Sequence, residues 1–124
     1  AAPARPWSRE QPDLRVFALA ADNVALLDSI GAWQAIRAAR AHPYRRMRVW
    51  DAAGGEELVF DGDAFGRESL GWIVENGLLV NQLRAAVAAA GVELHCPARV
   101  LAFEQDKDGA RLELDDGRQL ATRW

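Results

Sequence analysis

The spacing of apolar residues changes its period several times along the chain, and this pattern limits the folds open to it. Apolar residues recur at spacings of three and four in residues 13–30, 32–41 and 78–90, as expected of helices packed on one side. Short apolar runs between turn-forming residues lie between and after these segments and favour strands. The order of elements predicts an α+β or mixed α/β fold, without the regular alternation of a complete doubly wound sheet.

The ends of the predicted helices carry residues that suit helix termini. Asp13 is a plausible N-cap for the first helix, and Gly31 stands where a left-handed C-cap is expected. The second helix should bury Trp33 and Ile36, and Gly91 should end the third. Residues 1–14 contain three of the prolines and should form an extended lead-in.

The remaining apolar runs predict strands and turns. Two turns containing Asp-Gly, at 106–109 and 115–117, are strong hairpin signals within a C-terminal β-meander. The polar stretch 61–68 should form a loop. The predicted strands are 46–50, 58–60, 70–74, 92–96, 99–105, 110–114 and 119–124.

Composition excludes several classes of protein. The 124 residues carry a net charge of −3 without a dominant basic face, which argues against a nucleic-acid partner. The single cysteine, Cys96, excludes an internal disulfide and a cysteine-rich zinc site. No apolar run is long enough to span a membrane, and no secretion signal is visible. These properties predict a soluble, cytoplasmic domain.

Few residues suggest chemistry by their own pattern. His95 and Cys96 are adjacent, so on a strand they would point to opposite faces, and no metal site is predicted. The short basic run at Arg45, Arg46 and Arg48 is more typical of a solvated surface than of a phosphate site. The chain contains no Gly-x-Ser-x-Gly, Gly-x-Gly-x-x-Gly or Gly-x-x-x-x-Gly-Lys motif.

Two polar residues stand at predicted helix starts. Arg15 should open the first helix, where an anion would be favoured, although an exposed arginine is the simpler interpretation. Asn76 lies between the strand 70–74 and the helix 78–90. An amide there is usually a cap or turn former, and it can also bind a ligand across the helix start. Spacing alone does not decide between these alternatives.

Three segments together resemble a known family. Arg-Val-Phe-Ala-Leu-Ala at 15–20 with Leu-Leu-Asp-Ser-Ile-Gly-Ala-Trp at 26–33, the segment 42–51, and Leu-Gly-Trp-Ile-Val-Glu-Asn at 70–76 occur in the order seen in FAD-dependent ubiquinone-biosynthesis hydroxylases. These belong to the para-hydroxybenzoate hydroxylase type of flavoprotein monooxygenase. The resemblance covers residues 15–124. Family members are longer, so we expect an internal or truncated fragment of their FAD/NAD(P)-binding monooxygenase fold.

The resemblance implies a division of the chain and a set of cofactor contacts. Residues 15–41 and 76–124 would belong to the FAD-binding domain, and residues 42–75 would contribute to the sheet of the substrate domain. Arg15, Asn76 and Val100 match family positions near the FAD, Val100 through its backbone. No catalytic side chain and no metal ligand is predicted.

The implied reaction is hydroxylation of a polyprenylated phenol or benzoquinol ring, with FAD, NAD(P)H as reductant and O₂. The piece alone should be inactive and should bind FAD weakly. Association with the inner-membrane surface, with a ubiquinone-biosynthesis complex, or with further copies of the chain stays open. The alternative function is a small, non-enzymatic α+β module for binding or assembly.

Overall fold

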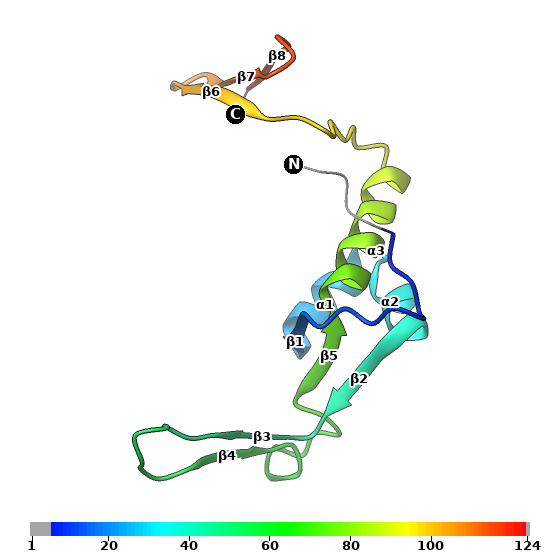
Figure 1. Ribbon diagram of the computed structural model, residues 1–124, viewed down its shortest axis with the longest axis vertical. Coiled ribbons are helices and arrows are strands. Elements are labelled where there is room, and N and C mark those ends of the chain that lie inside the picture. The colour runs from blue at the N-terminus through cyan, green and yellow to red at the C-terminus, as the bar shows by residue number, and fades with distance from the viewer. Residues whose placement is uncertain (1–5, 124) are drawn as a thin grey trace. The chain divides into compact units, whose positions relative to one another are not determined.

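The computed structural model describes residues 6–123, which form two compact units (Figure 1). The first unit comprises residues 6–92 and contains every helix of the described chain. The second comprises residues 93–123 and is built from strands alone. The mixture of helices and antiparallel sheets confirms the predicted α+β class.

A three-stranded antiparallel sheet organises the first unit. Its strand order is β1 (Val16–Ala20), β5 (Gly71–Glu75) and β2 (Ala41–Tyr44), so that β5 lies in the centre. Residue 16 pairs with residue 75 at one end of β1, and residue 20 pairs with residue 71 at the other. The sheet therefore joins segments that lie more than fifty residues apart in the sequence.

Three helices complete the core of this unit: α1 (Ala21–Ser29), α2 (Trp33–Arg40) and α3 (Asn76–Ala89). Gly31 follows α1 with a φ of 74°, the left-handed conformation expected after a helix. The predicted burial of Trp33 and Ile36 is confirmed, and α3 begins directly where β5 ends. The buried cluster consists of Leu27, Ala32, Trp33, Ile36, Val74 and Leu78.

A separate two-stranded hairpin extends the first unit between β2 and β5. β3 (Arg46–Val49) pairs with β4 (Leu58–Asp61), and a short 3₁₀ helix, η1 (Asp63–Phe65), follows within the predicted loop. Met47 lies opposite Phe60 and Val49 opposite Leu58, so these four side chains share one face. All four are at least 38% exposed. We call this set the apolar hairpin face.

The second unit is the predicted meander. β6 (Val100–Gln105), β7 (Gly109–Leu114) and β8 (Gln119–Arg123) pair in that order, with turns at the two Asp-Gly sites. The register shifts between Val100 and Ala102, which places a bulge at the start of β6.

Two predicted elements are wrong. Residues 14–20 were expected to be helical, but Val16–Ala20 is a strand and the helix begins only at Ala21. A short apolar run is compatible with the residue spacing of a helix and with that of a strand. Pairing with β5 makes this run a strand. Residues 92–96 form no strand, because within residues 6–123 no partner strand pairs with them. Across the same described range, no helix has the length and apolar character required to cross a membrane.

Candidate functional site

The junction between β5 and α3 brings two of the predicted site residues together. The backbone N–H of Asn76 donates a hydrogen bond to the carbonyl oxygen of Arg15 at 2.9 Å. This bond continues the β1–β5 ladder by one residue, so it follows from the strand pairing. The next N–H of the helix, that of Gly77, donates to Oδ2 of Asp13 at 2.9 Å. Asp13 therefore caps α3, and not the first helix as expected.

Glu75 lies beneath this junction and is the one buried charged residue among those described. Its Oε2 accepts hydrogen bonds from Trp7 Nε1–H at 2.8 Å and from the Asp13 N–H at 3.0 Å. Its Oε1 receives Nη1 of Arg40 in an ion pair at 2.6 Å. A buried carboxylate needs such partners, because unpaired charge away from water is costly.

Arg40 extends these contacts toward the lead-in. Its second terminal nitrogen donates to the carbonyl oxygen of Arg9, and its guanidinium lies 5.6 Å from the centre of the Trp7 ring. One arginine on α2 thus contacts the carboxylate of Glu75 and two residues of the segment 6–15. The planar, forked guanidinium suits such simultaneous contacts.

The pKa values of both carboxyl groups lie below their usual range. For Asp13, the strongest cause is the hydrogen bond from the Arg15 N–H, with further contributions from the Gly77 N–H, the Arg15 charge and the Asn76 side chain. Burial raises the pKa of Glu75, but the hydrogen bonds from Asp13, Trp7 and Arg40 outweigh it and lower the pKa overall. Both groups are therefore ionised at neutral pH.

Arg15 does not stand at the helix start at which the sequence predicts it. Arg15 does not open the first helix, because β1 follows it and α1 begins six positions later at Ala21. It lies instead beside the start of α3 through the bond from Asn76. Its side chain is exposed, and its guanidinium has no ion pair within residues 6–123. Val100 lies in the second unit, at the β6 bulge.

Sequence reasoning missed Glu75, Trp7 and Arg40. A glutamate at the end of the apolar run Trp72-Ile73-Val74 was the available signal, because an acid in a buried strand needs a partner. Nothing in the sequence indicates that the partners come from residues 7 and 40. They meet Glu75 only because β1 and β2, the strands that follow these residues in the chain, flank the central strand β5.

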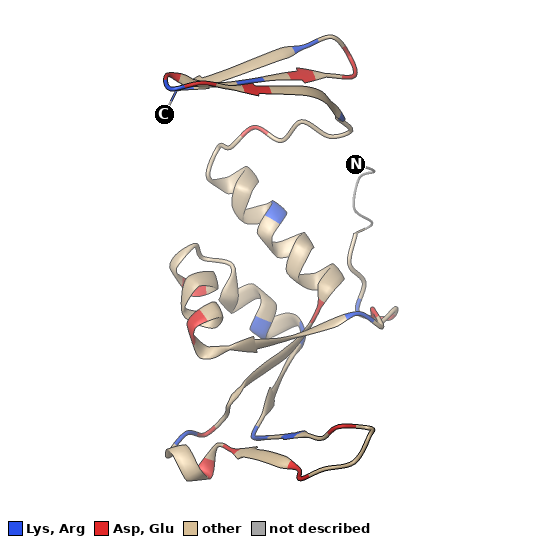
Figure 2. Ribbon diagram, turned by 90° about the vertical axis from the view of Figure 1, so that its left-hand side faces the viewer, with Lys and Arg blue, Asp and Glu red and all other residues tan. Residues whose placement is uncertain are grey.

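The basic run of the hairpin is neutralised by carboxylates of the same unit. Arg45 pairs with Asp63 at 2.6 Å, Arg46 with Asp61 at 2.6 Å, and Arg48 with Glu57. Figure 2 shows basic and acidic residues together along this hairpin. The pairing agrees with the expectation of a solvated surface and leaves no excess positive charge to attract phosphate.

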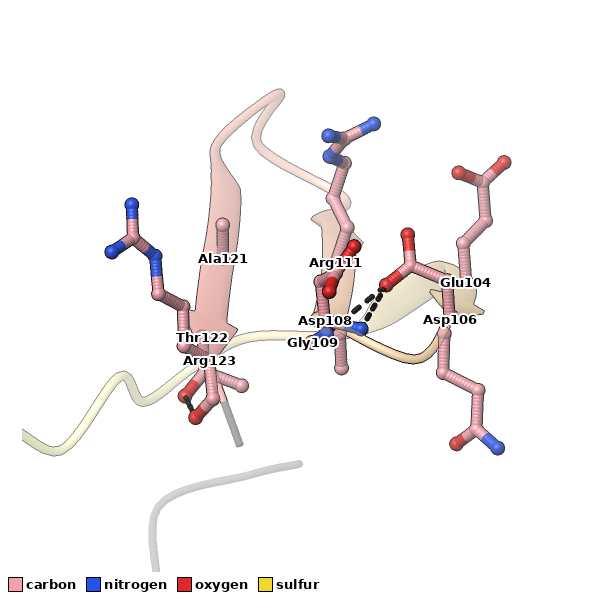
Figure 3. A pocket seen from close by; sticks show the side chains of 10 residues that line it. Glu104, Asp106, Asp108, Gly109, Arg111, Ala121, Thr122 and Arg123 are labelled. Atoms are coloured by element: carbon pink, nitrogen blue, oxygen red, sulfur yellow. Dashed lines mark hydrogen bonds between the residues drawn. The ribbon is translucent and has the colours of Figure 1, made fainter.

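A polar hollow of about 470 Å³ lies on the meander of the second unit (Figure 3). Asp106 shapes one end, where its Oδ1 accepts hydrogen bonds from the Asp108 N–H at 2.8 Å and the Gly109 N–H at 3.0 Å. The acidic residues Glu104, Asp106 and Asp108 outnumber the basic Arg111 and Arg123 in its lining. This charge balance disfavours an anionic ligand there.

Solved structures share this fold. The chain aligns with the OxyS anhydrotetracycline hydroxylase of Streptomyces rimosus with a TM-score of 0.66 and 20% identity, over 98% of this chain and 24% of that one. FqzB gives the same TM-score of 0.66 at 18% identity, over 90% of this chain and 25% of the other. The chain therefore has the fold of one segment of each of these two proteins.

Curated relatives narrow the class further. The chain is 36% identical over 114 residues to 3-demethoxyubiquinol 3-hydroxylase of Escherichia coli, and 34% identical over 119 residues to the mitochondrial ubiquinone biosynthesis monooxygenase COQ6 of Xenopus tropicalis. The alignments cover 91% and 88% of this chain but only 29% and 25% of those proteins. No family model matches the chain. The chain is homologous to one segment of the ubiquinone-biosynthesis hydroxylases, which confirms the predicted resemblance.

Proposed function

We propose that this chain supplies part of the cofactor and substrate surface of an FAD-dependent hydroxylase acting on a prenylated phenol or quinol in ubiquinone biosynthesis. The observation that carries the proposal is the 36% identity to the E. coli hydroxylase over 91% of the chain. NAD(P)H is the proposed reductant, and flavin, when bound, would supply the oxygen-transfer chemistry. The chain spans about a quarter of its curated relatives, so the proposed reaction requires elements of those proteins beyond the matched segment.

The junction offers donors suited to the phosphate or ribose oxygens of FAD. Arg15 provides an exposed guanidinium and Asn76 a side-chain amide at the start of α3. The first two N–H groups of α3 are already bound, to the Arg15 carbonyl and the Asp13 carboxylate. We propose that an anionic cofactor group is held by the guanidinium of Arg15, and by Asn76 when its side chain exchanges its hydrogen bond with Asp13 for one to the cofactor. Val100 lies in the second unit, and a contact of its backbone with FAD stays a prediction from the family resemblance.

The apolar hairpin face provides a surface for a lipid-tailed substrate. Met47, Val49, Leu58 and Phe60 lie together on one side of the hairpin and remain exposed. Contact with a prenyl chain would remove this apolar area from water, which is the main source of affinity for such ligands. In this proposal the chain positions ring and cofactor, and none of its side chains moves a proton.

A chimera tests the proposal directly. The matching segment of the E. coli hydroxylase is replaced by this chain, and bound FAD and hydroxylation of a prenylated quinol are measured. We expect the chimera to bind FAD, and Arg15→Ala and Asn76→Ala each to weaken binding about tenfold, as for loss of one hydrogen bond to a charged group. Arg9→Ala and Asn81→Ala are matched controls: Arg9 is an exposed arginine of the same lead-in, and Asn81 lies on the same helix.

Two outcomes would contradict the proposal. A folded chimera without flavin would favour the alternative function, a non-enzymatic α+β module. Equal losses of affinity in the site variants and in their controls would remove Arg15 and Asn76 from the cofactor site. The chain by itself contains no Gly-x-Gly-x-x-Gly motif, and we expect it to bind FAD more weakly than micromolar.

A further inference from the structure

We propose that Glu75 is a positioning residue, which fixes the lead-in segment, residues 6–15, across the start of α3 and so holds Arg15 and Asn76 as a pair. Glu75 itself is only 6% exposed, and its carboxylate accepts hydrogen bonds from Trp7, Asp13 and Arg40. Its significance for FAD rests on the proposed function. Its effect on the geometry of the junction can be measured without any cofactor.

The contacts of Glu75 all lead to segments that are distant in sequence. Trp7 Nε1–H and the Asp13 N–H bind one carboxylate oxygen, and Arg40 binds the other. Arg40 in turn contacts the Arg9 carbonyl and the Trp7 ring. Trp7, Arg9 and Asp13 belong to a segment without regular secondary structure, so these contacts supply the order that a helix or strand ladder would otherwise give.

Asp13 connects Glu75 to the backbone of Arg15 and Gly77 by hydrogen bonds. Its N–H is bound by Glu75, while its own carboxylate accepts the Arg15 N–H at 3.0 Å on Oδ1 and the Gly77 N–H at 2.9 Å on Oδ2. The Arg15 carbonyl then receives the Asn76 N–H at 2.9 Å. This bond is the last rung of the β1–β5 ladder, and Asp13, held by Glu75, binds the N–H groups of Arg15 and Gly77 on either side of it.

The charge of Glu75, and not its shape alone, is required. Both of its oxygens accept hydrogen bonds, and every partner is a donor. Glu75→Gln is nearly isosteric, but its NH₂ group must face a donor whichever way the amide is turned. The substitution should therefore release either Arg40 or the pair formed by Trp7 and Asp13, while the packing around position 75 is kept.

Amide hydrogen exchange of the full chain tests the proposal. In Glu75→Gln we expect exchange at Asn76 and Gly77 to accelerate about tenfold relative to wild type, because both N–H groups bind the lead-in. Exchange at Ile36, which bonds to Ala32 within the core, should change less than twofold. Glu57→Gln is the matched control, since it removes a carboxylate that pairs with an arginine of the exposed hairpin.

Trp7→Phe keeps the measurement informative if Glu75→Gln does not fold. It removes a single donor to Glu75 and leaves an aromatic ring beside Arg40, so the same two amides should accelerate to a smaller extent. Glu75→Asp keeps the charge and should restore part of the protection. A uniform acceleration of all amides, or none at Asn76 and Gly77, would overturn the proposal, because Glu75 would then contribute to stability only.

The flavin readout separates this proposal from the proposed function. In the hydroxylase chimera, Glu75→Gln should raise the dissociation constant of FAD about tenfold, matching the accelerated exchange. Absence of FAD from the unmodified chimera would refute the proposed function, and the exchange result would still decide the role of Glu75. Unchanged FAD affinity in a chimera that binds FAD would show that the positioning does not reach the cofactor.

Discussion

Gly71 illustrates how one residue fixes the sheet of the first unit. It begins β5, the central strand, between Ala20 of β1 and Tyr44 of β2. A Cβ atom at this position would lie 2.8 Å from the hydroxyl oxygen of Tyr44 and closer still to the carbonyl oxygen of Leu19. The absence of a side chain therefore lets both neighbouring strands approach.

We expect Gly71→Ala to lower the free energy of unfolding by roughly 3 kcal/mol, because the added methyl group must displace the backbone of Leu19 and the side chain of Tyr44. Gly31→Ala is the comparison, since that site is open and only its φ of 74° opposes alanine; it should cost about 1 kcal/mol. Urea unfolding of both variants measures the difference. Equal losses would contradict the steric role of Gly71.

Single residues also show what sequence reasoning could reach at the site. Arg15 and Asn76 are predicted from their local context and from the family resemblance, and one backbone bond joins them in the structure. Glu75 was not found, because its role depends on Trp7 and Arg40. Contacts across thirty to seventy residues carry no local spacing signal, so only the strand pairing reveals them.

Among the elements, the β3–β4 hairpin is the most clearly two-sided. The apolar hairpin face carries Met47, Val49, Leu58 and Phe60, while Arg46, Arg48 and Asp61 lie on the opposite face. A two-stranded hairpin with an uncovered apolar side has little core of its own. We expect such a face to bind hydrophobic probes.

We expect the double variant Leu58→Thr, Phe60→Thr to reduce the fluorescence of a bound hydrophobic dye, because it removes two of the four side chains of the apolar hairpin face. Threonine preserves the strand preference, so pairing with β3 should persist. Val59→Thr is the control, since Val59 is 54% exposed on the other face and should change the fluorescence little. Undiminished dye binding by the double variant would show that the probe binds elsewhere.

The elements differ in how clearly the spacing of their apolar residues identifies them as helix or strand. α2 and α3 were predicted because their apolar residues lie at helical spacings. In the structure, Trp33 and Ile36 belong to the buried cluster, and Leu79 and Leu83 pack against it. The run Val16–Ala20 has the same spacing of apolar residues as a helix, yet it adds to the edge of β5 as a strand. The apolar pattern of five residues does not distinguish a helix from a strand. The hydrogen bonds available at the edge of the sheet favour the strand.

At the scale of the whole molecule, the carboxyl groups with shifted pKa values all change the stability of the fold with pH in the same direction. Six carboxyl groups have a lowered pKa in the folded chain, namely Glu10, Asp13, Glu57, Asp61, Glu75 and Asp116. A carboxyl group of this kind binds protons more readily in the unfolded state. Its stabilising contribution is complete above its unfolded pKa of about 4 and is lost as the pH falls through the folded value.

We therefore expect the thermal midpoint to be constant near neutral pH and to fall steadily below about pH 4.5. Glu75→Gln should have a lower midpoint at pH 7, and its difference from wild type should shrink toward pH 3 as the native carboxylate becomes protonated. Circular dichroism melts at successive pH values provide the measurement. A midpoint that rises on acidification would contradict the assigned direction of the shifts.

The ion pairs in and beside the hairpin affect how the apolar hairpin face would attach to an apolar partner. Arg45, Arg46 and Arg48 each have a carboxylate partner within the same unit. Since these charges are compensated in place, they add little long-range attraction or repulsion to an encounter. Attachment through the apolar hairpin face would consequently depend little on ionic strength and would weaken on cooling, as burial of apolar surface does.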